Sequence, residues 1–558
     1  MLAAMLGKLR RRLGDSVTAL SAVFRNADLR RIEGAWAASN IGVWAYSVAA
    51  GVYAYQQGGA TAVGVVAAIR MLATALTAPF LSLLADRYPR KLAMIGSDLA
   101  RALALGAAAL AVWRSAPSIV VYALTVVVMV ATSAFRPAHA ALVPALARRP
   151  EELTAANVAG STIESVAIFL GPALGGLLLA GAGVAVVFLV TAGAFAWSAF
   201  LVVRIARDEP GVTATAEARG VLRDAIGGFE TVFRDSRVRL VVGLVSAQTF
   251  VAGALNVLIV SMALDLLDFG RSGVGFLNAA TGVGGLLGAI VLLAQTRKLG
   301  LTLGLGVLLW GAPIAVIGVW PDRVTALLLL GVVGLGNSLV DVPAFTLLQR
   351  AAPNEVLARV FGVLETAILL TVAAGAAVTP LLIHFAGLRG ALIVTGAFLP
   401  AVTALIWPQL RALDASAPEP RRELALLEAV PLFAPLSNPT LETIAANLVP
   451  LAFPAGSAVV REGGTGDRFY IVESGRLEAT QAGQHLSDLE EGDFFGEIAL
   501  LRDVPRTATV TASSDVRLLA LDRDEFVAVV TGHPESIEAA EAAIATRLGS
   551  LRPSMGIA

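Results

Sequence analysis

The chain has 558 residues, of which 56% are apolar and only 15% charged, whereas about a quarter of a typical soluble protein is charged. Residues 1–420 hold 31 Lys and Arg against 22 Asp and Glu, and residues 421–558 hold 11 against 20, so the tail lacks the basic surface that nucleic-acid binding needs. The absence of Cys excludes disulfides, thiolate catalysis and Cys-based metal sites, and the four His are scattered. We predict no metal site, no catalytic residue and no nucleic-acid partner.

The first segment, residues 1–31, is basic. Its opening, MLAAMLGKLRRRLG, lacks the apolar core and cleavage site of a secretory signal. Two interpretations stay open for it, an amphipathic segment that lies on the inner leaflet and a disordered basic leader.

Twelve apolar windows follow, each close to the roughly 20 residues that a helix needs to cross a bilayer. Their Gly and Ala content suits close helix packing in lipid. The windows are 32–55, 61–84, 92–113, 118–140, 155–180, 184–204, 238–263, 272–294, 300–320, 324–346, 358–385 and 389–407. We therefore predict a membrane all-α fold of twelve transmembrane helices in two six-helix halves, 32–204 and 238–410, joined by a middle loop, 205–237.

The basic residues give the orientation. Alternate connections, beginning with the N-terminal segment, hold 24 Lys and Arg, whereas the opposite loops hold only Arg114, Arg271, Arg323 and Arg389. Cytoplasmic loops carry the excess of Lys and Arg. We therefore predict a protein of the inner or plasma membrane. Its two termini, its C-terminal domain and its middle loop are predicted to lie in the cytoplasm.

The two halves also resemble each other in sequence. RPAHAALVPALARRPEEL leads to a helix with Glu164 and then to VTAGAF, and VPAFTLLQRAAPNEVLAR leads to a helix with Glu365 and then to VTGAF. Pro137 and Pro343, at matching places, are 206 residues apart. Parallel repeats of this size are a transporter architecture with the substrate path between the halves.

LSLLADRYPRK, Leu81 to Lys91, resembles the signature of the major facilitator superfamily between helices 2 and 3. That signature reads Gly-x-x-x-Asp-Arg-x-Gly-Arg-Lys; Asp86, Arg87, Arg90 and Lys91 fit it, whereas Ser82 and Pro89 replace its glycines. The Pro variant, with AFRPAHAALVPALARRPEELTAAN and GPALGGLL after it, is similar to the branch of enterobactin-type and macrolide exporters. The resemblance covers all twelve helices and implies a secondary transporter, not an enzyme.

Charged residues at membrane depth cost about 2.5–3.5 kcal/mol each on insertion scales and need a reason. Asp98 and Arg101 lie three apart on one helix face and can pair. With Asp86 and Arg90 they are interpreted as a cytoplasmic charge cluster, and the family resemblance implies that such a cluster latches the halves. Substrate contact is the alternative. Arg87 is a further gating candidate.

Glu164 and Glu365 occupy matching positions in the repeats. A poorly hydrated carboxylate has a raised pKa and is a candidate proton carrier; the alternative is a salt bridge, for instance between Glu164 and Arg136. Asp341 is the preferred transport-relevant carboxylate. Four polar residues are either cavity-lining or interhelical hydrogen-bond partners, namely Asn40, Gln248, Asn256 and Asn337. Aromatic and apolar walls, including Trp36, Trp44, Tyr46 and Phe250, favour a lipophilic or amphiphilic substrate.

After the last window, residues 411–423 form a Pro-, Ala- and charge-rich linker, and residues 424–558 form a separate domain. LALLEAVPLFAPLSNPTLETIAANL predicts two short amphipathic helices. Short alternating segments punctuated by Gly then predict a small β-barrel or jelly roll, and residues from Asp524 onward return to helix. This length suffices for one compact domain.

The segment FGEIALLRDVPRTATVTA, Phe495 to Ala512, carries the chemistry of the tail. A tight turn at Gly496 precedes a short helix that begins with Glu497, Ile498 and Ala499, and free N–H groups at a helix start favour an anion. Arg506 can donate two hydrogen bonds to phosphate oxygens. Glu497 suits a sugar hydroxyl, so the set describes a ribose phosphate.

This segment resembles the cyclic-nucleotide-binding domain of catabolite-activator proteins and kinase regulatory subunits. The resemblance implies that Glu497 holds the ribose 2′-hydroxyl and that Arg506, in PRTA with Thr507 and Ala508, holds the cyclic phosphate. Thr507 is compatible with cGMP and with cAMP, and cAMP is favoured. Candidates for a lid over the base lie in the final helix, namely Ile537, Ile544, Arg547 and Leu548.

We therefore predict a secondary transporter, an exporter of a small lipophilic or amphiphilic compound, that cyclic nucleotide regulates through the tail. Two alternatives stay open, a transporter-like nucleotide receptor without flux and a nucleotide exporter with feedback sensing. The chain shows no voltage-sensor pattern of a nucleotide-gated channel and no helix-turn-helix after the roll.

Overall fold

A computed structural model describes residues 25–87, 89–148, 150–206, 232–292, 299–351, 354–416, 421–436, 438–532 and 534–551. The chain divides into two compact units, Met1–Ala415 and Ser416–Ala558. Most of the predicted segment 1–31, most of the middle loop 205–237 and residues 417–420 of the linker lie outside the described residues.

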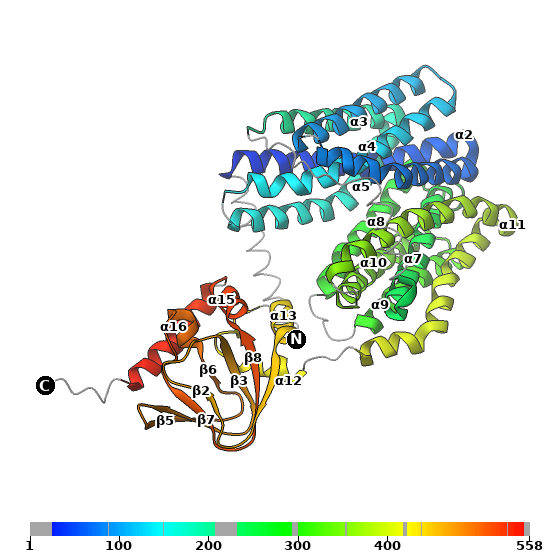
Figure 1. Ribbon diagram of the computed structural model, residues 1–558. Helices are drawn as coiled ribbons and strands as arrows, with labels where there is room; N and C mark the ends of the chain where they lie inside the picture. Colours follow the sequence, from blue (N-terminus) through cyan, green and yellow to red (C-terminus); the bar gives the residue numbers. More distant parts are fainter. Residues whose placement is uncertain are drawn as a thin grey trace. The chain divides into compact units, whose positions relative to one another are not determined.

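The first unit is helical, and Figure 1 shows the helices before and after the middle loop gathered as two groups. The first group is α2 (Ala27–Arg87), α3 (Arg90–Trp113), α4 (Ser118–Leu146) and α5 (Pro150–Val203). The second is α7 (Ser236–Ser261), the π-helix η1 (Met262–Leu266), α8 (Gly270–Leu292), α9 (Leu299–Val319), α10 (Arg323–Ala351) and α11 (Asn354–Ser416).

Nine helices in the described part of the chain are long and apolar enough to cross a membrane. The predicted count of twelve is therefore not confirmed. Three of the nine, Ala27–Thr77, Glu152–Val203 and Arg359–Ala412, contain 51, 52 and 54 residues. A straight helix of that length is roughly 75 Å long, against a hydrocarbon core of about 30 Å.

Each of these three helices contains a glycine with non-helical backbone. Gly59 has φ 59° and ψ −156°, Gly183 has φ 79° and ψ 177°, and Gly387 has φ 67° and ψ 171°. Positive φ is inexpensive for glycine and costly for other residues. Each break lies in a gap between two predicted windows.

Glycines also set the spacing of the helices in the second group. A Cβ at Gly284 would lie 1.8 Å from the carbonyl oxygen of Gly331, and one at Gly334 would lie 1.8 Å from that of Thr281, so α8 and α10 touch backbone to backbone. A Cβ at Gly375 of α11 would likewise lie 1.9 Å from the carbonyl oxygen of Phe250 in α7. This agrees with the small-residue interfaces of membrane helices.

The second unit is a roll of two antiparallel four-stranded sheets with helices before, within and after it (Figure 1). One sheet has the order β1-β8-β3-β6 and the other β2-β7-β4-β5. The strands are β1 (Val449–Phe453), β2 (Ala458–Val460), β3 (Arg468–Ser474), β4 (Leu477–Gln481), β5 (Gln484–Leu489), β6 (Phe494–Phe495), β7 (Thr509–Ala512) and β8 (Val516–Asp522). The helices are α12 (Arg421–Ala429), α13 (Asn438–Asn447), α14 (Glu497–Arg502), α15 (Arg523–Thr531) and α16 (Pro534–Leu551).

Apolar packing holds these helices on the roll. Phe469 of β3 stacks on Phe526 of α15 with ring centroids 4.5 Å apart, and Phe433, between α12 and α13, meets both rings edge-on. A second cluster, with Val472 and Leu518 at its centre, fills the space between the sheets. Burial of each such side chain stabilises the fold by roughly 1.5–3 kcal/mol. This packing therefore holds in place the part of the domain that carries α14.

Candidate functional site

The turn before α14 is built on Gly496. Its φ of 97° places it in the left-handed region, and a Cβ there would lie 2.5 Å from Nη1 of Arg506 and 2.9 Å from the carbonyl oxygen of Arg468. The position therefore requires glycine for conformation and for space. The turn brings the predicted residues Glu497 and Arg506 to one side of the roll.

Glu497 is the first residue of α14, and its side chain is only 1% exposed. Its Oε1 accepts a hydrogen bond of 2.7 Å from Nη1 of Arg547 in α16. Arg547 also donates to the carbonyl oxygen of Phe494 at 2.7 Å and lies 4.4 Å from the centre of the Phe494 ring. The final helix is thus tied to the carboxylate that is predicted to hold the ribose.

Arg506 is buried, with its side chain 4% exposed. Its Nη2 donates to the carbonyl oxygen of Arg468 at 2.8 Å and to Oδ1 of Asp467 at 3.1 Å, and Nη1 donates to the carbonyl oxygen of Gly496 at 3.3 Å. The ring of Tyr470 lies 5.7 Å from the guanidinium carbon; burial and then the charge of Asp467 raise the pKa of Tyr470. Three backbone and side-chain acceptors therefore orient the guanidinium.

Two buried polar atoms of this site have no hydrogen-bond partner among the described residues, Oε2 of Glu497 and Nε of Arg506. An unpaired buried polar group costs roughly 1–3 kcal/mol. Oε2 is an acceptor and suits a sugar hydroxyl, and Nε–H is a charge-assisted donor and suits a phosphate oxygen. The two open atoms therefore have the polarity that a ribose phosphate requires.

The other predicted pocket residues have ordinary surroundings. Ala499 is buried, whereas Ile498, Thr507 and Ala508 are half-buried. Of the lid candidates, Ile544 is buried and Ile537 is 39% exposed, Arg547 contacts Glu497 as described above, and the side chain of Leu548 lies outside the described residues. Sequence reasoning did not single out Asp467 and Arg468, which lie 39 and 38 positions before Arg506 and meet it only in the folded roll.

In the first unit, the structure shows Asp98 and Arg101 as an ion pair with both side chains fully buried. Arg101 also donates to Oγ of Ser39 at 3.0 Å and lies between the rings of Phe135 and Phe195, 4.6 and 4.3 Å from their centres. Arg90 donates instead to the carbonyl oxygen of Ala141 at 2.7 Å. The side chains of Asp86 and Arg87 lie outside the described residues.

The other membrane charges lie apart from that pair. Arg136 and Glu164 form the salt bridge that was one alternative for Glu164, at 3.3 Å, with Arg136 largely exposed and Glu164 half-buried. Glu365 is exposed. Asp341 accepts a 2.6 Å hydrogen bond from Asn337, whose oxygen accepts from Gln248 at 3.1 Å and from Trp310 at 3.0 Å, so α7, α9 and α10 meet in one polar network.

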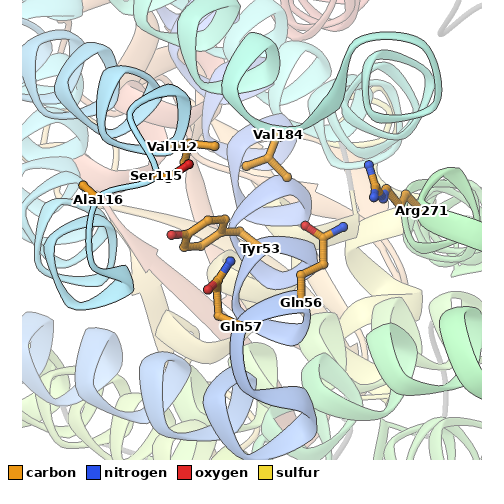
Figure 2. A pocket seen from close by; sticks show the side chains of 8 residues that line it. All are labelled: Tyr53, Gln56, Gln57, Val112, Ser115, Ala116, Val184 and Arg271. Carbon is orange, nitrogen blue, oxygen red and sulfur yellow. The ribbon is translucent and has the colours of Figure 1, made fainter.

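A cavity of about 330 Å³ lies among helix ends of the first unit and holds none of the predicted transport residues. Figure 2 shows Arg271 of α8 extending toward Gln56 of α2 at its edge. Its walls are Tyr53, Gln56, Gln57, Val112, Ser115, Ala116, Val184 and Arg271. Close by, the hydroxyl of Tyr55 donates to Asp265 of η1, so the two helix groups are joined at this end.

A family model described as Major Facilitator Superfamily matches residues 35–370, and a second one, described as Cyclic nucleotide-binding domain, matches residues 450–533. The chain belongs to the major facilitator superfamily and carries a C-terminal cyclic-nucleotide-binding domain. Neither family is catalytic, and the long apolar helices are consistent with an integral membrane protein. The more specific branch of enterobactin-type and macrolide exporters is not distinguished by these matches.

Individual proteins match shorter parts of the chain. The cAMP-dependent protein kinase regulatory subunit of Aspergillus fumigatus is 41% identical over 116 residues, 20% of this chain and 28% of that protein. A cyclic nucleotide-gated potassium channel of Rhizobium etli is 38% identical over 117 residues, 21% of this chain and 33% of that protein. A solved structure of cAMP-bound PfPKA-R is 24% identical, with a TM-score of 0.23 and coverage of 25% of this chain and 48% of that one. The chain therefore spans a third or less of the two curated relatives.

Proposed function

We propose that this protein is a secondary active transporter, an exporter of a small lipophilic or amphiphilic compound, that cyclic nucleotide regulates through its C-terminal domain. The observation that carries the proposal is the buried pair of Glu497 and Arg506, each with one open atom of the polarity that a ribose phosphate needs. It occurs in a chain whose other domain matches a transporter family. Aromatic residues of the membrane helices, such as Trp44 and Phe250, support a lipophilic substrate. The Pro variant of the loop signature, with the segments that follow it, supports the enterobactin and macrolide exporter branch.

For the membrane part we propose twelve spans, with the three long helices each folded into two at Gly59, Gly183 and Gly387. The breaks support this, because dividing three of the nine long apolar helices of the described residues at them gives twelve segments. Basic residues then place both termini and the tail in the cytoplasm. The domains are 1–31, 32–204, 205–237, 238–410, 411–423 and 424–558, as the sequence predicts.

In this topology the end of the molecule with Tyr55, Asp265, Gln56 and Arg271 faces outward. Its contacts between the two helix groups support a state that is closed to the outside. The buried pair of Asp98 and Arg101 is proposed as part of a cytoplasmic latch, and Asp341 as the transport-relevant carboxylate of the second half. Glu164 and Glu365 remain candidates for proton coupling.

In the tail, Glu497 would hold the ribose hydroxyl and Arg506 the cyclic phosphate, with cAMP favoured over cGMP. Regulation requires that the nucleotide bind the transporter states with different affinity, and a coupling of about 1–3 kcal/mol is ordinary for such effects. Residues 411–423 with α12 and α13 are the covalent connection through which the coupling would pass. The two alternatives, a receptor without flux and a nucleotide exporter, differ from this proposal in what crosses the membrane.

Everted membrane vesicles test the proposal, because in the proposed topology the tail faces the medium and nucleotide can be added directly. We expect accumulation of a fluorescent amphiphilic cation, ethidium, to change when cAMP is added, and Arg506→Ala to abolish the response to cAMP while keeping the basal rate. Accumulation of radiolabelled cAMP would support the exporter alternative. A nucleotide effect that persists in Arg506→Ala would contradict regulation through this pocket.

A further inference from the structure

Glu33, six residues from the start of α2, is a carboxylate that the candidates above do not include. It is only 4% exposed, and neither of its oxygens has a hydrogen-bond partner among the described residues. A buried ionised carboxylate without a partner is very costly. Such a group in a membrane segment marks a functional site by default.

The group that faces it is His139 of α4. Its Nε2 lies 3.9 Å from Oε1 of Glu33, and this nitrogen likewise has no hydrogen-bond partner in the described part of the chain. His139 as a whole is 8% exposed. An acid oxygen and an imidazole nitrogen that face each other without a donor between them can both be satisfied by one proton.

The surrounding residues shape a small, apolar compartment for this pair. Trp36 stacks on His139 with ring centroids 4.3 Å apart and an angle of 17°, and its Nε1 donates to the carbonyl oxygen of Gly160 at 3.3 Å. A Cβ at Gly160 would lie 3.4 Å from Oε2 of Glu33. Apolar residues of α2, α4 and α5 close the rest of the site.

The other charged groups of the packed elements have partners elsewhere. On α4 and α5, Arg136 pairs with Glu164 at 3.3 Å, and Glu152 accepts from Asn26 at 2.8 Å. The remaining pairs and hydrogen bonds are Asp28 with Arg31, Asp98 with Arg101, Arg90 with the Ala141 carbonyl and Lys91 with the Ile205 carbonyl. None of these partners is Glu33 or His139, although the charge of Arg136 also acts on His139.

We propose that Glu33 and His139 together form a binding site for a single proton in the first half of the transporter. The proton binds between Oε1 of Glu33 and Nε2 of His139 and makes the pair neutral overall; its release leaves a carboxylate facing a neutral imidazole. The two states differ by one charge in a poorly hydrated place, which is the property that proton coupling requires. The proposal rests on the transporter assignment and is independent of nucleotide binding.

Trp36 supplies the reporter, because protonation of a stacked imidazole quenches indole fluorescence. The fluorescence of the full-length protein in lipid nanodiscs would be titrated between about pH 5 and pH 9. The Trp36→Phe variant is titrated in parallel, and its fluorescence is subtracted to remove the contribution of the other six of the seven Trp. We expect one quenching step on acidification. The step should disappear in His139→Gln, and its midpoint should fall by at least about one pH unit in Glu33→Gln, which lacks the stabilising anion.

Asp268→Asn is the matched control, since that acid is exposed in the loop between η1 and α8 of the second helix group, and it should leave the midpoint unchanged. Absence of a step, or a midpoint that does not move in Glu33→Gln, would overturn the proposal. Calorimetry with cAMP on the same samples reports the tail, so nucleotide affinity in Glu33→Gln should equal that of the unmodified chain. Loss of both signals would show a misfolded variant, in which case Glu33→Asp, which keeps the carboxylate, must restore the step.

Discussion

At the scale of single residues, Arg547 is the finding that adds most to the sequence interpretation. The candidate lid residue contacts the carboxylate of Glu497 directly and at the same time caps the carbonyl of Phe494. Because Oε1 is occupied by Arg547, Oε2 is the oxygen that is open to the proposed ribose hydroxyl. Arg547 is thus a positioning residue for Glu497 in this site.

Arg547→Ala should weaken cyclic-nucleotide binding by about tenfold or more, since one charge-assisted hydrogen bond to a buried group contributes roughly 1.5–3 kcal/mol. Calorimetric titration of the full-length protein measures the change. Arg502→Ala is the matched control, because the pair of Arg502 with Glu541 is exposed on both sides and exposed pairs contribute little. Unchanged or tighter binding in Arg547→Ala would show that Arg547 does not position Glu497.

The predictability of the site differs from residue to residue. Glu497 and Arg506 follow from a local segment of sequence, because turn, helix and return strand are neighbours in the chain. The contacts of Glu497 with Arg547, and of Glu33 with His139, join residues 50 and 106 positions apart. Such pairings depend on how helices pack. For Glu33 the only local signal was the position of an acid within an apolar window.

At the scale of elements, the turn into α14 depends on Gly496. Gly496→Ala should lower nucleotide affinity by at least about tenfold, because positive φ costs a non-glycine residue about 1–2 kcal/mol and the new Cβ would press on Arg506. Calorimetry together with the thermal unfolding midpoint measures both effects. Gly483→Ala has a similar φ, +80°, but open space around it, and should keep its affinity; equal losses in the two variants would contradict a specific role for Gly496.

The close contact of α8 with α10 depends on the absence of a side chain at Gly334. Gly334→Ala should lower the thermal midpoint of the full-length protein, since overpacking of a close contact typically costs about 1–3 kcal/mol. Intrinsic Trp fluorescence follows the unfolding. Gly193→Ala, in a helix with no neighbouring atom within 4 Å, is the control and should be neutral or slightly stabilising. A Gly334→Ala midpoint at the level of the control would mean that the backbones are not in contact.

The elements of the tail follow the sequence pattern closely, because alternation, glycine turns and short amphipathic helices are local signals. The membrane part is harder to divide into elements. Helices α2, α5 and α11 continue through the predicted gaps and are broken only at glycines, Gly58 and Gly59 in α2, Gly183 in α5 and Gly387 in α11. Hydropathy gives the apolar length of a segment, whereas the place of a tight reversal depends on one backbone conformation.

At the scale of the whole molecule, a transporter-family domain and a cyclic-nucleotide-binding domain occur in one chain. A transporter passes between states of nearly equal free energy, so a ligand that distinguishes those states by a few kcal/mol changes their populations strongly. The central claim is that the tail binds such a ligand at Glu497 and Arg506. The proposed regulation of transport depends on that binding.

Isothermal titration calorimetry of the purified full-length protein with cAMP and with cGMP tests this claim most directly. We predict saturable heat at one nucleotide per chain, tighter with cAMP than with cGMP, and loss of that heat in Arg506→Ala while the protein stays monodisperse. No saturable heat with either nucleotide would contradict the account, because the buried carboxylate and guanidinium would then serve the fold of the roll alone.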